Sequence, residues 1–227
     1  MSDIVRLPGS GPEEKAGQKP EGETGYWSLA WPRLWGDYGA LLVGGMWEQR
    51  GRLDSETWVL SRVGPFCPSM SLSTELVATS GFAKKLTRRF PRIQLVPVVK
   101  GKIVHLRWET WDRTSPQPPL LPCSGEPEDY INLLPHSESA SAEMGDLYQV
   151  VPPDGGGDYK RVEEGVELDR SCPPEYPFFR VGEGSLACYV VTDEARSWLE
   201  SEAGGWLGYR VARFRSAQRR GRRRSSR

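Results

Sequence analysis

Residues 178–214 read FFRVGEGSLACYVVTDEARSWLESEAGGWLGYRVARF and hold the strongest structural pattern in the chain. Two β-rich runs, FFRV and LACYVV, flank a Gly-Glu-Gly turn. Thr192 follows as a helix N-cap with two acidic residues in the first turn, and ARSWLESEA is amphipathic up to the stop at Gly204-Gly205. WLGYRVARF then closes the segment as a strand. The order strand, strand, capped helix, strand predicts an α+β fold.

A second helix is expected upstream, within STELVATSGFAKKLTRRF at residues 73–90. Its apolar residues recur with helical spacing, which predicts a helix from about Ser80 to Arg89 with Ser80 as N-cap and Pro91 beyond its end. Residues 92–112, RIQLVPVVKGKIVHLRWETWD, predict a hairpin that turns at Lys100-Gly101. Pro97 lacks an amide proton, so its strand is expected at a sheet edge or at a bulge.

Composition divides the chain further. Residues 1–25 and the Arg-rich 216–227 lack core-forming side chains, which predicts a disordered leader and a disordered tail. Between them we expect a Trp-rich α+β lobe at 26–114, a Pro-rich connection at 115–124 and an acidic α+β lobe at 125–215. The expected fold is α+β, a mixed or antiparallel sheet with a few short helices. The sequence shows no recognisable internal repeat.

The formal net charge of the 227 residues is zero, yet the charge is unevenly distributed. Residues 26–125 hold 13 basic and 7 acidic side chains, whereas residues 126–202 hold 5 basic and 18 acidic ones. Eight arginines and no acid follow between Arg213 and Arg227. An acidic half can steer a basic partner, and the basic tail can equally lie on the acidic surface.

Catalytic and metal-binding patterns are missing from the sequence. The four cysteines form no C-x-x-C pair, only two histidines are present, and no phosphate-binding or nucleophile-elbow motif occurs. His105 and Glu109 would lie about 13 Å apart on a strand, and His136 near Glu138 lies in a polar loop, so neither histidine forms a ready catalytic pair. We therefore expect no enzyme, no cofactor and no metal. The apolar runs are too short to span a membrane and residues 1–15 lack an apolar signal region, so the expected compartment is the cytoplasm.

Two groups of side chains are candidates for binding a protein partner. Trp108 and Trp111 are three residues apart, so on a strand they would point to opposite faces. Either both belong to the core or one is exposed as an anchor for a partner. The acidic candidates lie in one short stretch: Glu163, Glu164, Glu167 and Asp169. Surface solvation explains these acids equally well.

An alternative function is association with nucleic acid, because arginine and lysine neutralise phosphates. Its candidate residues are a patch on the expected helix and the C-terminal tail: Lys84, Lys85, Arg88, Arg89, Arg219, Arg220, Arg222, Arg223 and Arg224. No aromatic RNA-binding motif accompanies them.

Residues 93–214 resemble immunity proteins of bacterial polymorphic toxin systems. The likeness is carried, in order, by Leu95-Val-Pro-Val, Leu168-Asp169-Arg170-Ser171, Phe178-Phe179-Arg180-Val181, Val190-Val191-Thr192-Asp193, Trp198-Leu199 and Gly208-Tyr209-Arg210-Val211. The resemblance implies a non-catalytic protein that neutralises a cognate toxin by binding it. The acidic half of the chain fits a basic toxin. A related group has a double CXXCG motif, which is missing here, so no metal site is implied.

Overall fold

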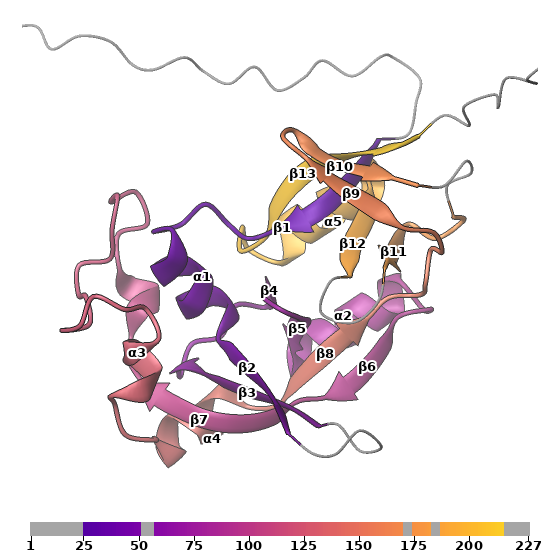
Figure 1. Ribbon diagram of the computed structural model, residues 1–227. Helices are drawn as coiled ribbons and strands as arrows, with labels where there is room; N and C mark the ends of the chain where they lie inside the picture. The colour runs from indigo at the N-terminus through magenta and orange to yellow at the C-terminus, as the bar shows by residue number, and fades with distance from the viewer. Residues whose placement is uncertain (1–24, 51–56, 170–173, 183–186, 216–227) are drawn as a thin grey trace, which may run out of the picture.

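The computed structural model describes residues 25–50, 57–169, 174–182 and 187–215, and it shows an α+β protein (Figure 1). Both segments expected to be disordered, apart from Gly25, lie outside these residues. The strands are β1 Tyr26–Ala30, β2 Met46–Arg50, β3 Thr57–Gly64, β4 Met70–Leu72, β5 Leu76–Thr79, β6 Gln94–Pro97, β7 Val99–His105, β8 Leu147–Val151, β9 Tyr159–Val162, β10 Gly165–Leu168, β11 Phe178–Val181, β12 Cys188–Thr192 and β13 Gly208–Phe214. The helices are α1 Asp37–Gly44, α2 Ser80–Arg89, α3 Asp129–Asn132, α4 Glu138–Met144 and α5 Asp193–Glu202, with a 3₁₀ turn at Trp108–Thr110.

The strands form two copies of one arrangement. The larger sheet has the order β11-β12-β1-β13-β10-β9, and the remaining strands form sheets with the orders β4-β5-β8-β6 and β2-β3-β7. Because β6 runs into β7 across a single residue, the second set reads β4-β5-β8-β6/β7-β3-β2. The matching strands also pair alike, since β10 with β13 and β3 with β7 are both parallel. The topology therefore contains an internal repeat that the sequence does not reveal.

Each copy takes one strand from the other half of the chain. β1 lies between β12 and β13 and is antiparallel to both, although it comes from the N-terminal half. β8 lies between β5 and β6 in the same way, although it comes from the C-terminal half. The expected division into lobes at 26–114 and 125–215 is therefore corrected. β1, which precedes the connection at 115–124, pairs with strands that follow it, and β8, which follows the connection, pairs with strands that precede it.

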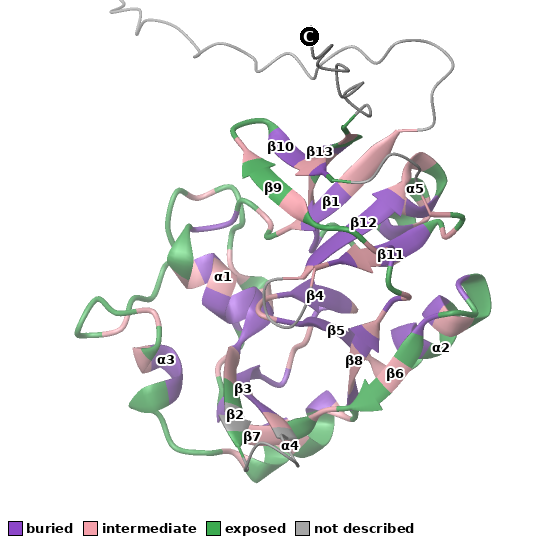
Figure 2. Ribbon diagram, turned by 45° about the vertical axis from the view of Figure 1, so that its right-hand side comes forward, coloured by how far each residue is buried: buried purple, intermediate pink, exposed green. Residues whose placement is uncertain are grey.

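The two copies share one core, in which the helices α2 and α5 face each other. Trp198 of α5 packs its ring on Phe82 and Phe90 of α2, with centroids 5.7 and 5.3 Å away. Lys85 of α2 pairs with Glu202 at the end of α5 at 2.8 Å, and Arg89 at the end of α2 pairs with Glu194 in the first turn of α5, so the two helices run antiparallel. The same core takes apolar side chains from β1 and from the mostly buried strands β5 and β12 (Figure 2), which makes the two copies one hydrophobic unit.

The strands and the helix predicted for residues 178–214 are confirmed. β11, β12, α5 and β13 occupy the expected runs, and Thr192 is the N-cap, its hydroxyl accepting from the Ala195 amide at 3.3 Å. Helix α2 has the expected bounds, but its N-cap is Thr79 and Ser80 is its first residue. The edge position of Pro97 is also confirmed, since β6 ends its sheet.

Two predictions in residues 92–112 are wrong. Lys100-Gly101 is not a turn: it lies inside β7, and the chain instead changes sheet at Val98, between β6 and β7. Gly101 fits against β3, where a Cβ would stand 2.6 Å from the hydroxyl of Ser61. Trp108 and Trp111 are not on a strand either, because β7 ends at His105 and a 3₁₀ turn follows.

The larger sheet curls, and this creates the site. In a flat sheet β12 and β9 would lie four strand spacings, or roughly 19 Å, apart. Side chains of both strands nevertheless join one apolar cluster inside the curl, among them Cys188 of β12 and Tyr159 of β9. The strands approach closely where β10 meets β13, since a Cβ on Gly165 would stand 2.0 Å from the Val211 carbonyl oxygen.

Candidate functional site

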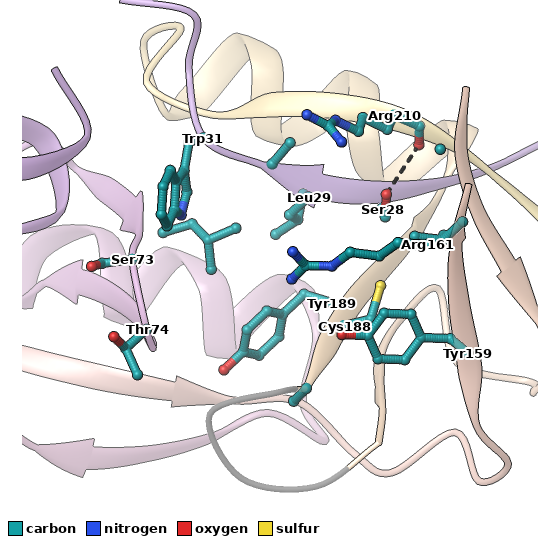
Figure 3. Close-up of a pocket in the computed structure, with 15 residues that line it drawn as sticks. Ser28, Leu29, Trp31, Ser73, Thr74, Tyr159, Arg161, Cys188, Tyr189 and Arg210 are labelled. Atoms are coloured by element: carbon teal, nitrogen blue, oxygen red, sulfur yellow. Dashed lines mark hydrogen bonds between the residues drawn. The ribbon is translucent and has the colours of Figure 1, made fainter. Parts of the chain in front are cut away.

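A polar pocket opens at one end of the curled sheet, beside the turn between β4 and β5 (Figure 3). Its volume is about 550 Å³, within the range of sites that hold small molecules. Strands β1, β9, β10, β12 and β13 contribute to its wall, and residues 72–74 complete it. We call it the arginine pocket, after Arg161 of β9 and Arg210 of β13.

Strand alternation places both arginines on the inner face of the curl. Arg210 is two residues before Ala212, and Arg161 is two residues after Tyr159; Ala212 and Tyr159 both belong to the cluster inside the curl. Figure 3 shows the guanidinium group of Arg161 extending into the pocket. Neither arginine makes an ion pair with a carboxylate in the part of the chain that the structure describes. The pocket therefore has two positive charges without a counter-charge.

Trp31 forms another side of the arginine pocket, directly after β1. Its side chain is 52% exposed and has no ring partner among the described residues. Its backbone is held closely, because a Cβ on Gly208 would stand 2.5 Å from its carbonyl oxygen. A fixed backbone thus presents a free indole face at the pocket.

The floor of the pocket is closed by Tyr189, whose hydroxyl is already engaged. It donates to the buried carboxylate of Glu75 at 2.9 Å, and Gln149 donates to the same oxygen at 3.0 Å. Burial, and then the Glu75 charge, raise the pKa of Tyr189, so this phenol stays protonated. Glu75 is only 6% exposed and these donors hold it behind the tyrosine.

Cys188 lies in the same wall, and burial raises its pKa to about 12. The neighbouring Arg161 charge opposes part of this shift but does not overcome it. A thiol with such a pKa is not a nucleophile near neutral pH. Cys67 is also protonated, since burial raises its pKa more than the adjacent Arg62 lowers it.

The four acidic candidates lie on and beside the hairpin of β9 and β10, next to the arginine pocket. Glu164 pairs with Arg213 at 3.6 Å and Glu167 pairs with Arg215 at 3.0 Å. Glu163 and Asp169 are exposed. The beginning of the basic C-terminal segment thus lies on the acidic surface, and it neutralises half of the candidate set.

The two tryptophan candidates differ in their exposure. Trp108 is 1% exposed and packs between Phe66 and Trp206, so its side chain is not accessible to a partner in this structure. Trp111 is half-buried against Tyr130 of α3. The surface around α3 carries exposed aliphatic side chains, from Leu120 and Leu121 before the helix and from Leu133 and Leu134 after it. We call these four leucines the α3 surface.

The basic candidates of α2 are exposed, but two of them are paired. Lys85 contacts Glu202 and Arg89 contacts Glu194, both on α5, while Lys84 and Arg88 point to solvent. The tail candidates Arg219, Arg220, Arg222, Arg223 and Arg224 lie outside the described residues.

His136 has a structural role in this fold. Its Nδ1 accepts the backbone amide of Ile103 at 3.0 Å, and its Nε2 lies 3.3 Å from a Glu138 oxygen. The neighbouring Ser137 hydroxyl caps α4, where it accepts the Ala140 amide at 3.2 Å. Within the described ranges no three His, Cys, Asp or Glu side chains are grouped so as to hold a metal ion.

Comparison with family models, curated proteins and solved structures gave no match. In the described part of the chain no helix is long and apolar enough to cross a membrane. The chemistry of the surface is therefore the basis for assigning a function.

Sequence reasoning missed the arginine pocket and the α3 surface. The signal for the pocket was present in GYRVARF, where Arg210 shares the strand face of Ala212 and Phe214, an arrangement that puts a charge on an inward face. The signal for the α3 surface was two Leu-Leu pairs in otherwise polar loops. Neither signal shows where these residues lie in the folded protein, so the two surfaces could be located only in the structure.

Proposed function

We propose that this protein is a non-catalytic immunity protein that binds and neutralises a cognate toxin in the cytoplasm. The observation that carries the proposal is the α3 surface, in which the side chains of Leu120 and Leu133 are 53% and 65% exposed. Exposed aliphatic side chains on the segments that flank one short helix are a feature of protein-binding surfaces. The resemblance of residues 93–214 to immunity proteins agrees with this role.

An aromatic cluster holds the backbone beside the α3 surface. Trp111 packs on Trp35 and Tyr130 at centroid distances of 5.7 and 6.3 Å. The Tyr130 hydroxyl also donates to the Leu120 carbonyl oxygen, which ties the Pro-rich segment to α3. Burial raises the pKa of Tyr130 to about 12, so the hydroxyl keeps its proton at neutral pH. A backbone fixed in this way limits the entropy lost on binding.

The nucleic-acid alternative has less support. Two of the four α2 cations are engaged by α5 acids, which leaves Lys84 and Arg88. A groove that tracks a phosphate backbone needs a continuous row of cations. The paired arrangement favours a structural role for Lys85 and Arg89.

Co-expression with the toxin encoded by the neighbouring gene tests the proposal. The intact protein is expected to restore growth and to co-purify with the toxin, and Leu133→Asp combined with Leu120→Asp is expected to abolish both. Val96→Asp is the matched control, because Val96 is 45% exposed on the edge strand β6 and does not belong to the α3 surface. No rescue by the intact protein, together with tight binding to generic DNA, would favour the alternative.

A further inference from the structure

The arginine pocket has a composition that the toxin-binding role does not require. It brings two cations and an exposed indole into one cavity of about 550 Å³. Hydroxyl groups of Ser28, Ser73 and Thr74 add polar atoms to its wall. A ligand that uses all three kinds of group must have a negative charge and a flat apolar part.

The charges are the strongest part of this argument. Arginine presents a planar donor group that fits the oxygens of carboxylate and phosphate. Both arginines line the pocket and are exposed to solvent, where a ligand can reach them. Carboxylates elsewhere on this sheet pair with arginines, as Glu164 and Glu167 do with Arg213 and Arg215. Arg161 and Arg210 have no such pair among the described residues, so a bound anion would supply the missing counter-charge.

Glu75 does not supply the counter-charge of the pocket. It is not a lining residue, and its carboxylate accepts from Tyr189 and Gln149 rather than from either arginine. Ser28 lies on β1, which pairs with β13, and points its hydroxyl toward the Arg210 carbonyl at 3.4 Å, a long contact that a ligand can replace. The donors facing the cavity thus exceed the acceptors.

We propose that the arginine pocket binds a small molecule in which an oxyanion is attached to a flat ring. Arg161 and Arg210 hold the oxyanion, and the free face of Trp31 stacks on the ring. Stacking on an aromatic side chain stabilises a bound ring, so Trp31 adds to the affinity as well as to the choice of ligand. The proposal does not depend on the identity of any toxin.

Calorimetric titration of the full chain tests the proposal with three probes: adenosine monophosphate, indole-3-acetate and neutral adenosine. At least one of the anionic probes is expected to bind at least tenfold more tightly than adenosine. Preference for adenosine monophosphate would identify phosphate as the oxyanion, and preference for indole-3-acetate would identify carboxylate. Equal or absent binding of all three up to roughly 10 mM would overturn the proposal.

Substitutions distinguish binding in the arginine pocket from a general attraction of anions to positive charge. Arg161→Gln and Arg210→Gln are each expected to weaken the preferred anionic probe at least tenfold, and Trp31→Ala at least fivefold. Lys160→Gln is the matched control, since Lys160 is an exposed cation of the same strand on its other face. It should leave affinity unchanged. Arg161→Lys keeps the charge without the planar donor group, so it should give an intermediate loss.

Inward or edge charges also discourage edge-to-edge aggregation of strands. If Arg161 had only this role, Arg161→Gln and Lys160→Gln would change the affinity for the probe equally, and both would lower the solubility of the protein. Urea unfolding of each variant, expected within experimental error of the parent, confirms that the affinity measurements report on folded protein.

Discussion

The carboxylate of Asp193 joins the first strand of the chain to its last helix through Trp27. One oxygen accepts the indole N–H of Trp27 at 2.7 Å, and the other accepts the backbone N–H of Gly25 at 2.7 Å. Asp193 also lies in the first turn of α5, where the helix dipole favours a negative charge. Arg196, one turn later, lies 3.9 Å from the centre of the same indole ring. Side chains of α5 therefore hold the N-terminal end of β1, the strand that the larger sheet takes from the N-terminal half of the chain.

Asp193→Ala is expected to lower the free energy of unfolding by about 2 to 3 kcal/mol, because it leaves two partly buried donors without their charged acceptor. Urea unfolding followed by tryptophan fluorescence measures the change. Glu163→Gln serves as the control for loss of a negative charge, since Glu163 is exposed on the β9–β10 hairpin. Equal effects from the two substitutions would mean that the contact with Trp27 contributes nothing.

The attachment of α5 can be tested at its cap and at its packing face. Thr192→Ala is expected to cost about 1 kcal/mol, since the hydroxyl accepts the Ala195 amide. Thr79→Ala, at the N-cap of α2, should cost less, because that side chain makes no capping hydrogen bond. Trp198→Ala removes a ring that contacts Phe82 and Phe90 and should cost about 3 kcal/mol or more. Thermal and urea unfolding of the three variants rank these effects, and a different order would show that α5 is held in another way.

Local sequence patterns predicted the elements better than their partners. The Thr192 cap and the two glycines after α5 act on neighbouring residues, so the local sequence was enough to predict the strand–helix–strand segment. The partner of Trp27 in β1 is Val191, far along the chain, and no local periodicity reports such a pairing. The exchange of β1 and β8 therefore became visible only in the fold.

The errors around Trp108 have a local cause. The run that begins at Val99 is rich in β-branched residues as far as His105, and nothing in its composition marks the turn that follows. Trp108 then enters a core formed by α1, α3 and residue 206, which tertiary packing decides. The arginine pocket escaped prediction for a related reason, since Arg161 and Arg210 are brought to one side of the sheet only by the pairing of β9 and β13 with β10.

Cys188 predicts how stability depends on alkaline pH. Burial raises its pKa to about 12 in the folded protein, whereas an unfolded cysteine has a pKa of about 8.5. Between these values the unfolded state loses a proton that the folded state keeps, so the free energy of unfolding falls as pH rises. The contribution is fully present below about pH 8 and disappears gradually above it.

Urea unfolding from pH 7 to 11 measures this dependence, and Cys188→Ala is expected to make it less steep. Alkylation of the native protein at pH 8, mapped by peptide mass spectrometry, gives an independent check. Among the cysteines that the structure describes, Cys123 is exposed and should react before the half-buried Cys67, whereas the buried Cys188 should react only after unfolding. Rapid native labelling of Cys188 would contradict its assignment as a buried, protonated thiol.

The exchanged strand makes a final prediction about the ends of the chain. Removing residues 1–24 and 216–227 should change the melting temperature by less than about 5 °C, because those segments lack core-forming side chains. Extending the N-terminal deletion through Ala30 removes the strand that joins β12 to β13, together with the buried Leu29. Two ladders lose their hydrogen-bonding partner at once, so this variant should not fold.

Complementation in trans distinguishes loss of this strand from a general effect of truncation. A synthetic peptide of residues 25–32 supplies the same backbone groups and should restore a cooperative unfolding transition, as strand addition does in other sheets. The same peptide with Leu29→Asp is the matched control, since it would place a charge in the core shared by α2 and α5. Restoration by both peptides, or a stable fold without either, would show that β1 is not required between β12 and β13.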